Sequence, residues 1–423
     1  MIDYNTRLLY MMRYFGALTM RYRFRMKAPV DPEALNNAMQ KSMKRYPYLA
    51  KKMTVKEGTY VLEENDLPVP VFETRTPMPA FGSKELNYHL ISADHNGNDI
   101  YFTILHNLGG GRGMFRWAFS VLYQYIREIT GKDPDIPGVR RPDLYPEPGE
   151  ELIEPLLDLP EIERKWKGFP EGTSPIPPSK LEEMLKEDGE EGMYVTIFSV
   201  DGEKIMEKVK QNGATPSIWF TVLFYKALIK CLPEIPECLD LGITCDVSDQ
   251  YGFSESMSLI TKFLHFMIRK DDAEEDIQTL CRKGRIEIND QKDPGATNEL
   301  LKKERDTLIQ MEKLPSLQEK ADYYMKHSLI ADMVPSTLVS YVGKYDLNGT
   351  DEYLESALIT GFNSTNGIVI TAVKGRFQLV MAHRYKNAKI VRAFEEVLKE
   401  QGVEIISAER DLCQNTLKVE LPV

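Results

Sequence analysis

The sixteen residues from 100 to 115 constrain the fold most strongly. An apolar run from Ile100 to Leu105 ends in His106, a turn containing four glycines follows, and an apolar-periodic segment begins directly after it. Glycine lets a backbone turn sharply and approach a bound molecule closely. A strand that ends at His106 presents the imidazole from a rigid scaffold at a rim, which is where binding and catalytic residues concentrate. His106 is therefore the first candidate for chemistry.

The totals limit the class of protein. With 423 residues, the chain is long for a single hydrophobic core, so we expect two domains. The formal net charge of -11 argues against nucleic acid or an anionic membrane as the main partner. The five cysteines are odd in number and form no CxxC pair, which indicates a reducing compartment and neither a disulfide framework nor a zinc cluster.

The sequence predicts a cytoplasmic protein. Its N-terminus lacks the basic start and apolar core of a signal peptide. No uninterrupted apolar run approaches the ~20 residues that a membrane-spanning helix needs. The histidines show no HxxxH or HxxE spacing, so the sequence predicts no metal site.

Strand patterns alternate with helix patterns in both halves of the chain, which predicts an α/β protein with mixed sheets. Tyr22 to Lys27 alternate as a half-buried strand does, and Asp31 with Pro32 is typical of a helix start. Residues 94–99 are read as a polar turn, and residues 257–269 fit a strand or a helix. The other expected strands cover residues 51–55, 59–62, 69–73, 100–105, 193–200, 241–247, 338–343, 366–373 and 376–383, and the expected helices 33–45, 114–130, 179–187, 202–211, 218–232, most of 272–327, and 389–401.

Residues 131–180 differ in character from the rest of the chain. They contain eleven prolines, a frequency that prevents long regular elements. The segment fits a surface crossover or a lid, and the sequence favours neither. We place the boundary at its end, with an N-terminal lobe over residues 1–178 that carries His106 and a C-terminal lobe over residues 179–423.

The glycine turn resembles a phosphate-binding loop only superficially. It lacks the GKS or GKT ending of a P-loop, and a GxGxxG pattern fails because its last glycine falls on Met114 or Arg116. A helix that starts near Gly113 still favours an anion at its N-terminus, where Arg112 either contributes or is solvated. Asp246 and Asp249 fit paired carboxylates for hydrolysis less well than turn and helix-cap roles.

Four segments in order resemble the chloramphenicol acetyltransferase-like superfamily of coenzyme A-dependent acyltransferases, and most closely its branch of bacterial alcohol acetyltransferases and condensation domains. They are Val30–Leu35, Arg45–Leu49, Leu105–Gly111 and Ser340–Gly343, the third of which is similar to the family's HHxxxDG motif at a strand end. The resemblance implies two similar α/β lobes, each a two-layer arrangement with a mixed sheet, and a channel between them.

The residue-by-residue match is mixed. His106 matches the catalytic histidine, which implies a general base, and Gly111 matches the motif glycine. Gly110 replaces the motif aspartate, which in the family forms a buried ion pair with an arginine. The matching segment, residues 245–251, lacks that arginine too, and the loss of both partners is more tolerable than the loss of one. Ser340, or a backbone N–H in residues 340–343, is the implied oxyanion donor, with Gly110 and Gly111 as further support.

Two functions follow from this resemblance. The first is acyl transfer from a coenzyme A or carrier-protein thioester to a small alcohol or amine, with acyl-CoA as co-substrate, no bound cofactor and His106 as base. The second is a catalytically degenerate relative that binds a ligand or protein in the channel, since Gly110 stands in place of the aspartate. The sequence leaves open whether the protein is an enzyme.

Overall fold

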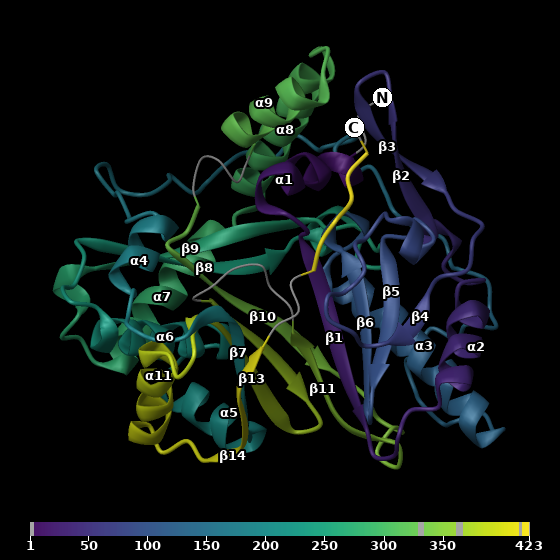
Figure 1. Ribbon diagram of the computed structural model, residues 1–423. Coiled ribbons are helices and arrows are strands. Elements are labelled where there is room, and N and C mark those ends of the chain that lie inside the picture. Colours follow the sequence, from purple (N-terminus) through teal and green to yellow (C-terminus); the bar gives the residue numbers. More distant parts are fainter. Residues whose placement is uncertain (1–3, 329–333, 361–366, 414–416, 423) are drawn as a thin grey trace.

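The computed structural model describes residues 4–328, 334–360, 367–413 and 417–422 (Figure 1). The helices of this part are α1 (Arg7–Phe15), α2 (Pro32–Ser42), α3 (Gly111–Thr130), α4 (Pro178–Met184), α5 (Gly202–Gln211), α6 (Pro216–Cys231), α7 (Ile277–Gln291), α8 (Pro294–Glu312), α9 (Leu317–His327) and α11 (Lys389–Glu400). The strands are β1 (Thr19–Met26), β2 (Lys51–Lys56), β3 (Thr59–Glu64), β4 (Val71–Glu73), β5 (Ile91–Asn96), β6 (Asp99–Leu105), β7 (Glu191–Asp201), β8 (Cys238–Asp246), β9 (Thr261–Arg269), β10 (Thr337–Tyr345), β11 (Leu354–Thr360), β12 (Gly367–Val373), β13 (Arg376–Tyr385) and β14 (Ile405–Cys413).

Two mixed sheets form the centres of the two lobes. The first has five strands in the order β11-β1-β6-β5-β4, and α2 and α3 pack together beside it. The second has seven strands in the order β14-β7-β13-β12-β10-β8-β9, with α5, α6 and α11 against it (Figure 1). Both sheets contain parallel and antiparallel pairs, as β4 with β5 and β10 with β12 run parallel. The predicted α/β class with two mixed-sheet lobes is confirmed.

Strand β1 is buried on both faces, which differs from the half-buried strand that its alternation predicts. One set of alternating residues, Met20, Tyr22 and Phe24, belongs to the core cluster that also includes α3. The opposite face carries three arginines, and it is covered because Glu409 of β14 binds both Arg23 and Arg25. The alternation is therefore between an apolar face and a face of paired charges.

Arg21, the remaining arginine of β1, forms the most deeply buried ion pair of this sheet. Both nitrogens of the Arg21 guanidinium fork reach Asp94 on β5, each at 2.6 Å, and the Asp94 side chain is fully buried. Thr103 accepts a further bond from Arg21, and Thr74 donates to Asp94. Asp94 was expected in a polar turn, but β5 extends through it to Asn96.

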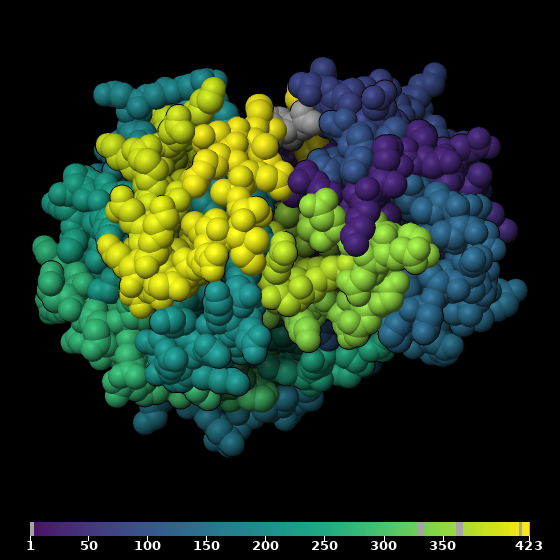
Figure 2. Space-filling view, turned by 90° about the horizontal axis from the view of Figure 1, so that it is seen from below, coloured from purple at the N-terminus to yellow at the C-terminus, as the bar shows by residue number. Residues whose placement is uncertain are grey.

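Strand β11 comes from the second half of the chain and completes the first sheet. It pairs antiparallel with β1, with Arg21 opposite Thr360 and Phe24 opposite Ala357. On the face seen in Figure 2, the yellow-green surface near residue 350 lies between the blue and yellow parts of the molecule. Leu358 of β11 also packs against Val195, Ile197 and Val380 of the second sheet. The proposed boundary near residue 178 stays a prediction, and this strand joins the two lobes across it.

Residues 131–177 contain no helix or strand, as their prolines predict. Residues 257–269, which fitted a strand or a helix, form the strand β9 from Thr261 onward. The segment before it, Met257 to Ile260, has no regular secondary structure and packs against the turn after β6. Helix α3 begins at Gly111, three residues earlier than expected.

We expect Asp94→Ala to lower the free energy of unfolding by about 3–5 kcal/mol, because it leaves the Arg21 charge buried without its partner. Urea unfolding followed by circular dichroism measures the change. The matched control is Glu85→Gln, which removes a carboxylate from the exposed pair with Arg75 and is expected to cost about 0–1 kcal/mol. Equal losses in the two variants would contradict the role of the buried pair.

Candidate active site

His106 follows the last residue of β6 and begins a short 3-10 turn, His106–Leu108. Its Nδ1 lies 2.8 Å from the carbonyl oxygen of Gly109. A carbonyl only accepts hydrogen bonds, so Nδ1 carries the proton and the neutral ring keeps a lone pair on Nε2. The chain thus selects the tautomer in which Nε2 is the basic nitrogen.

The surroundings of His106 favour the neutral ring. Burial lowers the pKa of His106 below its usual value, and this effect outweighs the Gly109 carbonyl, whose hydrogen bond raises the pKa. The positive charge of Arg7 lowers it further. His106 is therefore unprotonated at neutral pH and able to accept a proton.

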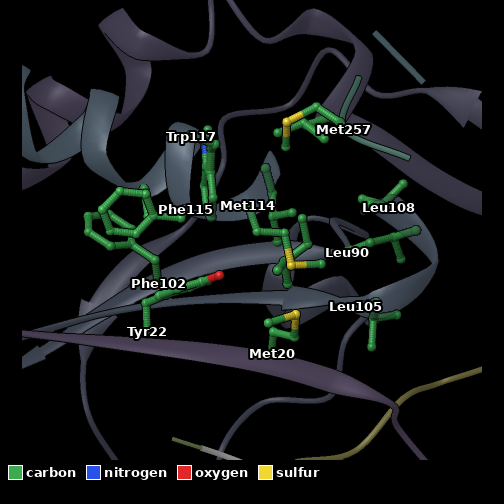
Figure 3. Close-up of a cluster of buried hydrophobic side chains, with 14 of the residues drawn as sticks. Met20, Tyr22, Leu90, Phe102, Leu105, Leu108, Met114, Phe115, Trp117 and Met257 are labelled. Atoms are coloured by element: carbon green, nitrogen blue, oxygen red, sulfur yellow. The ribbon is translucent and has the colours of Figure 1, made fainter. Parts of the chain in front are cut away.

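The glycine turn is shaped by close packing against the segment from Met257 to Leu259. A Cβ on Gly109 would lie 2.5 Å from the carbonyl oxygen of Met257, and one on Gly113 would lie 2.8 Å from the Cα of Met257. The N–H of Gly110 donates to the same carbonyl at 3.0 Å. Figure 3 shows Met257 among the methionines, leucines and aromatic rings that gather around the turn. These glycines therefore make room for a neighbouring backbone, which explains the sequence feature without a phosphate.

A cavity of about 840 Å³ opens beside His106, between the two lobes. Helix α3 contributes one wall, the strands β8, β9 and β10 contribute the other, and the proline-rich crossover contributes part of the rim. The lining residues are Met20, His106, Gly111, Arg112, Phe115, Arg116, Phe119, Pro137, Gly138, Arg140, Thr244, Asp246, Leu259, Thr261 and the run from Ser340 to Asp346. The predicted residues His106, Gly111 and Ser340 thus share one cavity.

Ser340 lies on the wall formed by the second sheet. Its Oγ is 2.8 Å from the Oγ1 of Thr244, and both side chains line the cavity. One hydroxyl hydrogen is used in the bond between them, which leaves the other hydroxyl as a possible donor toward a ligand. Gly110 uses its N–H on Met257, so Ser340 and Thr244 are the better placed donors. Sequence reasoning missed Thr244, because its partner is almost one hundred residues away.

Aromatic rings close the side of the cavity next to Gly111. Phe115 and Tyr345 stack with ring centroids 3.6 Å apart and planes 7° apart. The hydroxyl of Tyr22 donates to the carbonyl oxygen of Gly111 at 2.5 Å. The first turn of α3 is therefore fixed from β1 on one side and from β10 on the other.

The family resemblance implied an aspartate after His106 and an arginine in residues 245–251. The structure links the same two segments by an ion pair in which the charges are exchanged. Arg112, two residues after Gly110, binds Asp249 at 2.6 Å and lies 3.4 Å from Asp246. The carboxylates thus come from the last residue of β8 and from the turn after it, and the arginine comes from α3. Asp246 also accepts bonds from the backbone N–H and hydroxyl of Ser248, the turn role expected for it.

Within the ranges that the structure describes, no group of three or more His, Cys, Asp or Glu side chains is arranged to hold a metal ion. In the same ranges, no helix is both long and apolar enough to cross a membrane.

No protein-family model and no curated protein matches the sequence. Solved structures do match. The polyketide synthase associated protein 5 from Mycobacterium tuberculosis has a TM-score of 0.57 at 10% identity, with 94% of this chain and 96% of that chain covered. The epimerization domain from the third module of tyrocidine synthetase B also has a TM-score of 0.57, at 9% identity, with 95% and 96% covered.

The TRI101 protein of F. sporotrichioides, solved with coenzyme A and T-2, has a TM-score of 0.57 at 13% identity, with 93% of this chain and 97% of that chain covered. The chain has the chloramphenicol acetyltransferase-like fold. The resemblance drawn from the four sequence segments is confirmed at the level of fold, over nearly the whole length of the neighbours.

We expect Gly109→Ala to destabilise the protein and Gly110→Ala to be tolerated. Both positions have backbone angles open to alanine, with φ of 164° and -91°. The two positions differ in the room that they offer a Cβ. At Gly109 it meets a backbone oxygen at 2.5 Å, whereas at Gly110 it meets the Leu259 side chain at 3.3 Å. Overpacking of this kind costs about 1–3 kcal/mol. Thermal unfolding measures both, and an equal loss in the two variants contradicts the packing argument.

Proposed function

We propose that the protein transfers an acyl group from a thioester to a hydroxyl or amine acceptor in the cavity between its lobes. The observation that carries the proposal is the state of His106, whose Nδ1–H is bound to Gly109 while Nε2 is left as a free base in the cavity wall. A base of this kind contributes about 10²–10⁴-fold to a rate.

The proposed reaction has four steps. Nε2 of His106 takes the proton of the acceptor hydroxyl or amine, and the acceptor atom attacks the thioester carbonyl. The Ser340–Thr244 hydroxyl pair donates a hydrogen bond to the resulting oxyanion. When the intermediate collapses, the carbon–sulfur bond breaks, and the departing thiolate receives the proton from His106. The products are the acylated acceptor and a free thiol.

Coenzyme A is the donor that the similar structures suggest. The TRI101 structure contains coenzyme A together with T-2, which is a small-molecule partner. Tyrocidine synthetase B supplies the other kind of neighbour, a domain from a modular synthetase. A carrier-protein thioester is thus the alternative donor, and the same His106 chemistry serves both.

A second candidate function is ligand binding without catalysis. The observation that favours it is Gly110, which replaces the motif aspartate and therefore supplies no carboxylate at this position. The Arg112 ion pair favours catalysis instead. It links α3 to the segment that contains Asp246 and Asp249, as the aspartate–arginine pair of the family would. Tight binding of a thioester or acceptor without thiol release is the outcome that supports this second function.

We expect His106→Ala to lower acyl transfer by about 10²–10⁴-fold, because the variant lacks the base. Thiol release from acetyl-CoA is followed with a panel of alcohols and amines. His95→Ala serves as the matched control, since His95 lies on β5 away from the cavity lining. Equal turnover by wild type and His106→Ala rules out the assignment of the base.

The rate should also depend on pH in a defined direction. Protonated His106 cannot accept a proton, and its pKa lies below the usual value of about 6.5 because the ring is buried. We therefore expect kcat/KM to fall as the pH is lowered, with the midpoint of the fall below pH 6.5. Circular dichroism over the same range checks that the fold is intact. A fall centred above pH 6.5 contradicts this assignment.

A further inference from the structure

Beyond His106, a chain of alternating charges runs from the cavity wall into the protein, and acyl transfer as described does not use it. It consists of Arg45, Glu150, Arg140, Glu255 and Arg116, and we call it the arginine network. Arg45 binds Glu150 at 2.7 Å, and Arg140 lies 3.6 Å from the same carboxylate. Arg140 binds Glu255 at 2.6 Å, and Arg116 lies 3.3 Å from that carboxylate.

The arginine network has one positive charge in excess, because three arginines share two glutamates. Its interior is desolvated, since the side chains of Arg45, Glu150 and Arg140 are 5%, 4% and 9% exposed. Nη1 of Arg140 is buried and has no hydrogen-bond partner among the described residues. An unmatched cation in such surroundings is unfavourable unless another anion approaches it.

The excess charge faces the cavity. Arg116 and Arg140 are the members of the network that line it. Burial lowers the pKa of Arg116, and the positive charge of Arg140 lowers it further, whereas Glu255 raises it. Arg112 adds little to this imbalance, because Asp246 and Asp249 already surround it. A ligand anion between Arg116 and Arg140 would relieve their mutual repulsion.

The position of the two arginines indicates which part of a substrate carries the anion. Arg116 lies five residues after Gly111 on α3, about 7.5 Å further along the helix axis. The pantetheine arm of coenzyme A separates its sulfur from its nearest phosphate by about four extended residues' length, roughly 14 Å. The spacing from Gly111 to Arg116 is thus about half the length of the pantetheine arm, so an anion beside Arg116 fits an acceptor better than a phosphate of the donor.

We propose that the acceptor carries a carboxylate, which Arg116 and Arg140 bind while its hydroxyl or amine is directed to His106. This inference rests on the proposed acyl transfer. Guanidinium forks suit carboxylates because they bind both oxygens. Phe115, which precedes Arg116 on α3, lines the cavity next to the turn, and Phe119 lines it further along the helix, so an apolar group fits between the carboxylate and the reacting atom. The substrate class is thus an apolar hydroxy acid or amino acid.

Calorimetry with paired ligands tests the proposal without requiring turnover. The probes are 4-(hydroxymethyl)benzoate with its amide, 4-(aminomethyl)benzoate with its amide, and coenzyme A with pantetheine. In both acids an apolar ring separates the carboxylate from the hydroxyl or amine. We expect at least one acid to bind wild type ten or more times more tightly than its amide. Arg116→Gln and Arg140→Gln should each abolish that preference, whereas Arg141→Gln, which removes the neighbouring exposed arginine paired with Asp143, should preserve it.

Glu255→Gln provides a variant that is expected to fold, because the Glu255 side chain is 57% exposed. It releases Arg116 and Arg140 from their shared carboxylate, so it should bind the acid about two to ten times more tightly and the amide as before. The proposal is overturned if no acid is preferred over its amide, or if the preference survives in both arginine variants. It is likewise overturned if those variants weaken coenzyme A but neither pantetheine nor the acids, since the anion would then be a donor phosphate.

The same measurements separate this inference from the proposed reaction. His106→Ala should keep the preference for acids while it loses thiol release. A preference for acids in a protein that releases no thiol with any acceptor supports the carboxylate site and rejects acyl transfer. Thiol release that is equally fast with acids and amides supports acyl transfer and rejects the carboxylate site.

Discussion

The contact between the glycine turn and the Met257–Leu259 segment determines where the rest of the site lies. The Met257 carbonyl accepts the Gly110 N–H, and the Leu259 carbonyl accepts bonds from Tyr4 and Arg7 near the N-terminus. One short irregular segment, directly before β9, therefore holds the N-terminal residues and the turn after β6 together. Because His106 is bonded within that turn, its orientation depends on a segment about 150 residues further along the chain.

Buried charge is the second constraint. One face of β1 carries Arg21, Arg23 and Arg25. Each of these arginines forms an ion pair with a different carboxylate. Such pairs add little net stability compared with apolar packing, but the removal of one partner is costly. Their main effect is therefore to make the loss of either partner costly. The arginine network differs from them in that its charges do not cancel.

The sequence predicts the elements best where the pattern is local. Asp31 caps α2 by accepting bonds from Glu33 and Ala34, and the hairpin of β12 and β13 turns at Lys374 and Gly375, as expected. Strand β5 was read partly as a turn, because Asp94 and His95 are polar and their partners are distant in the chain. Helix α1 and strands β11 and β14 were not predicted. β14 is an edge strand in which Glu409, Arg410 and Asp411 follow one another, so it lacks the alternation that marks a half-buried strand.

The same distinction applies to the candidate site. His106, Gly111 and Ser340 could be singled out because each stands in a recognisable local motif, and the structure brings them to one cavity; their chemical roles stay predictions. Thr244 and Arg140 could not be found in that way. Their positions depend on the pairing of β8 with β10 and on the path of an irregular crossover, neither of which leaves a periodic signal.

The pairing of β11 with β1 also affects how the protein folds during its synthesis on the ribosome. Arg21 is paired with Thr360, so the first sheet lacks its edge until about six-sevenths of the chain has been synthesised. Until then β1 exposes a row of unsatisfied backbone groups beside Arg23, whose carboxylate partner Glu409 is synthesised later still. Such an edge is open to pairing with other chains. The lobe that carries His106 begins the polypeptide, yet it is among the last parts that can be finished, because loop closure over such a separation is slow.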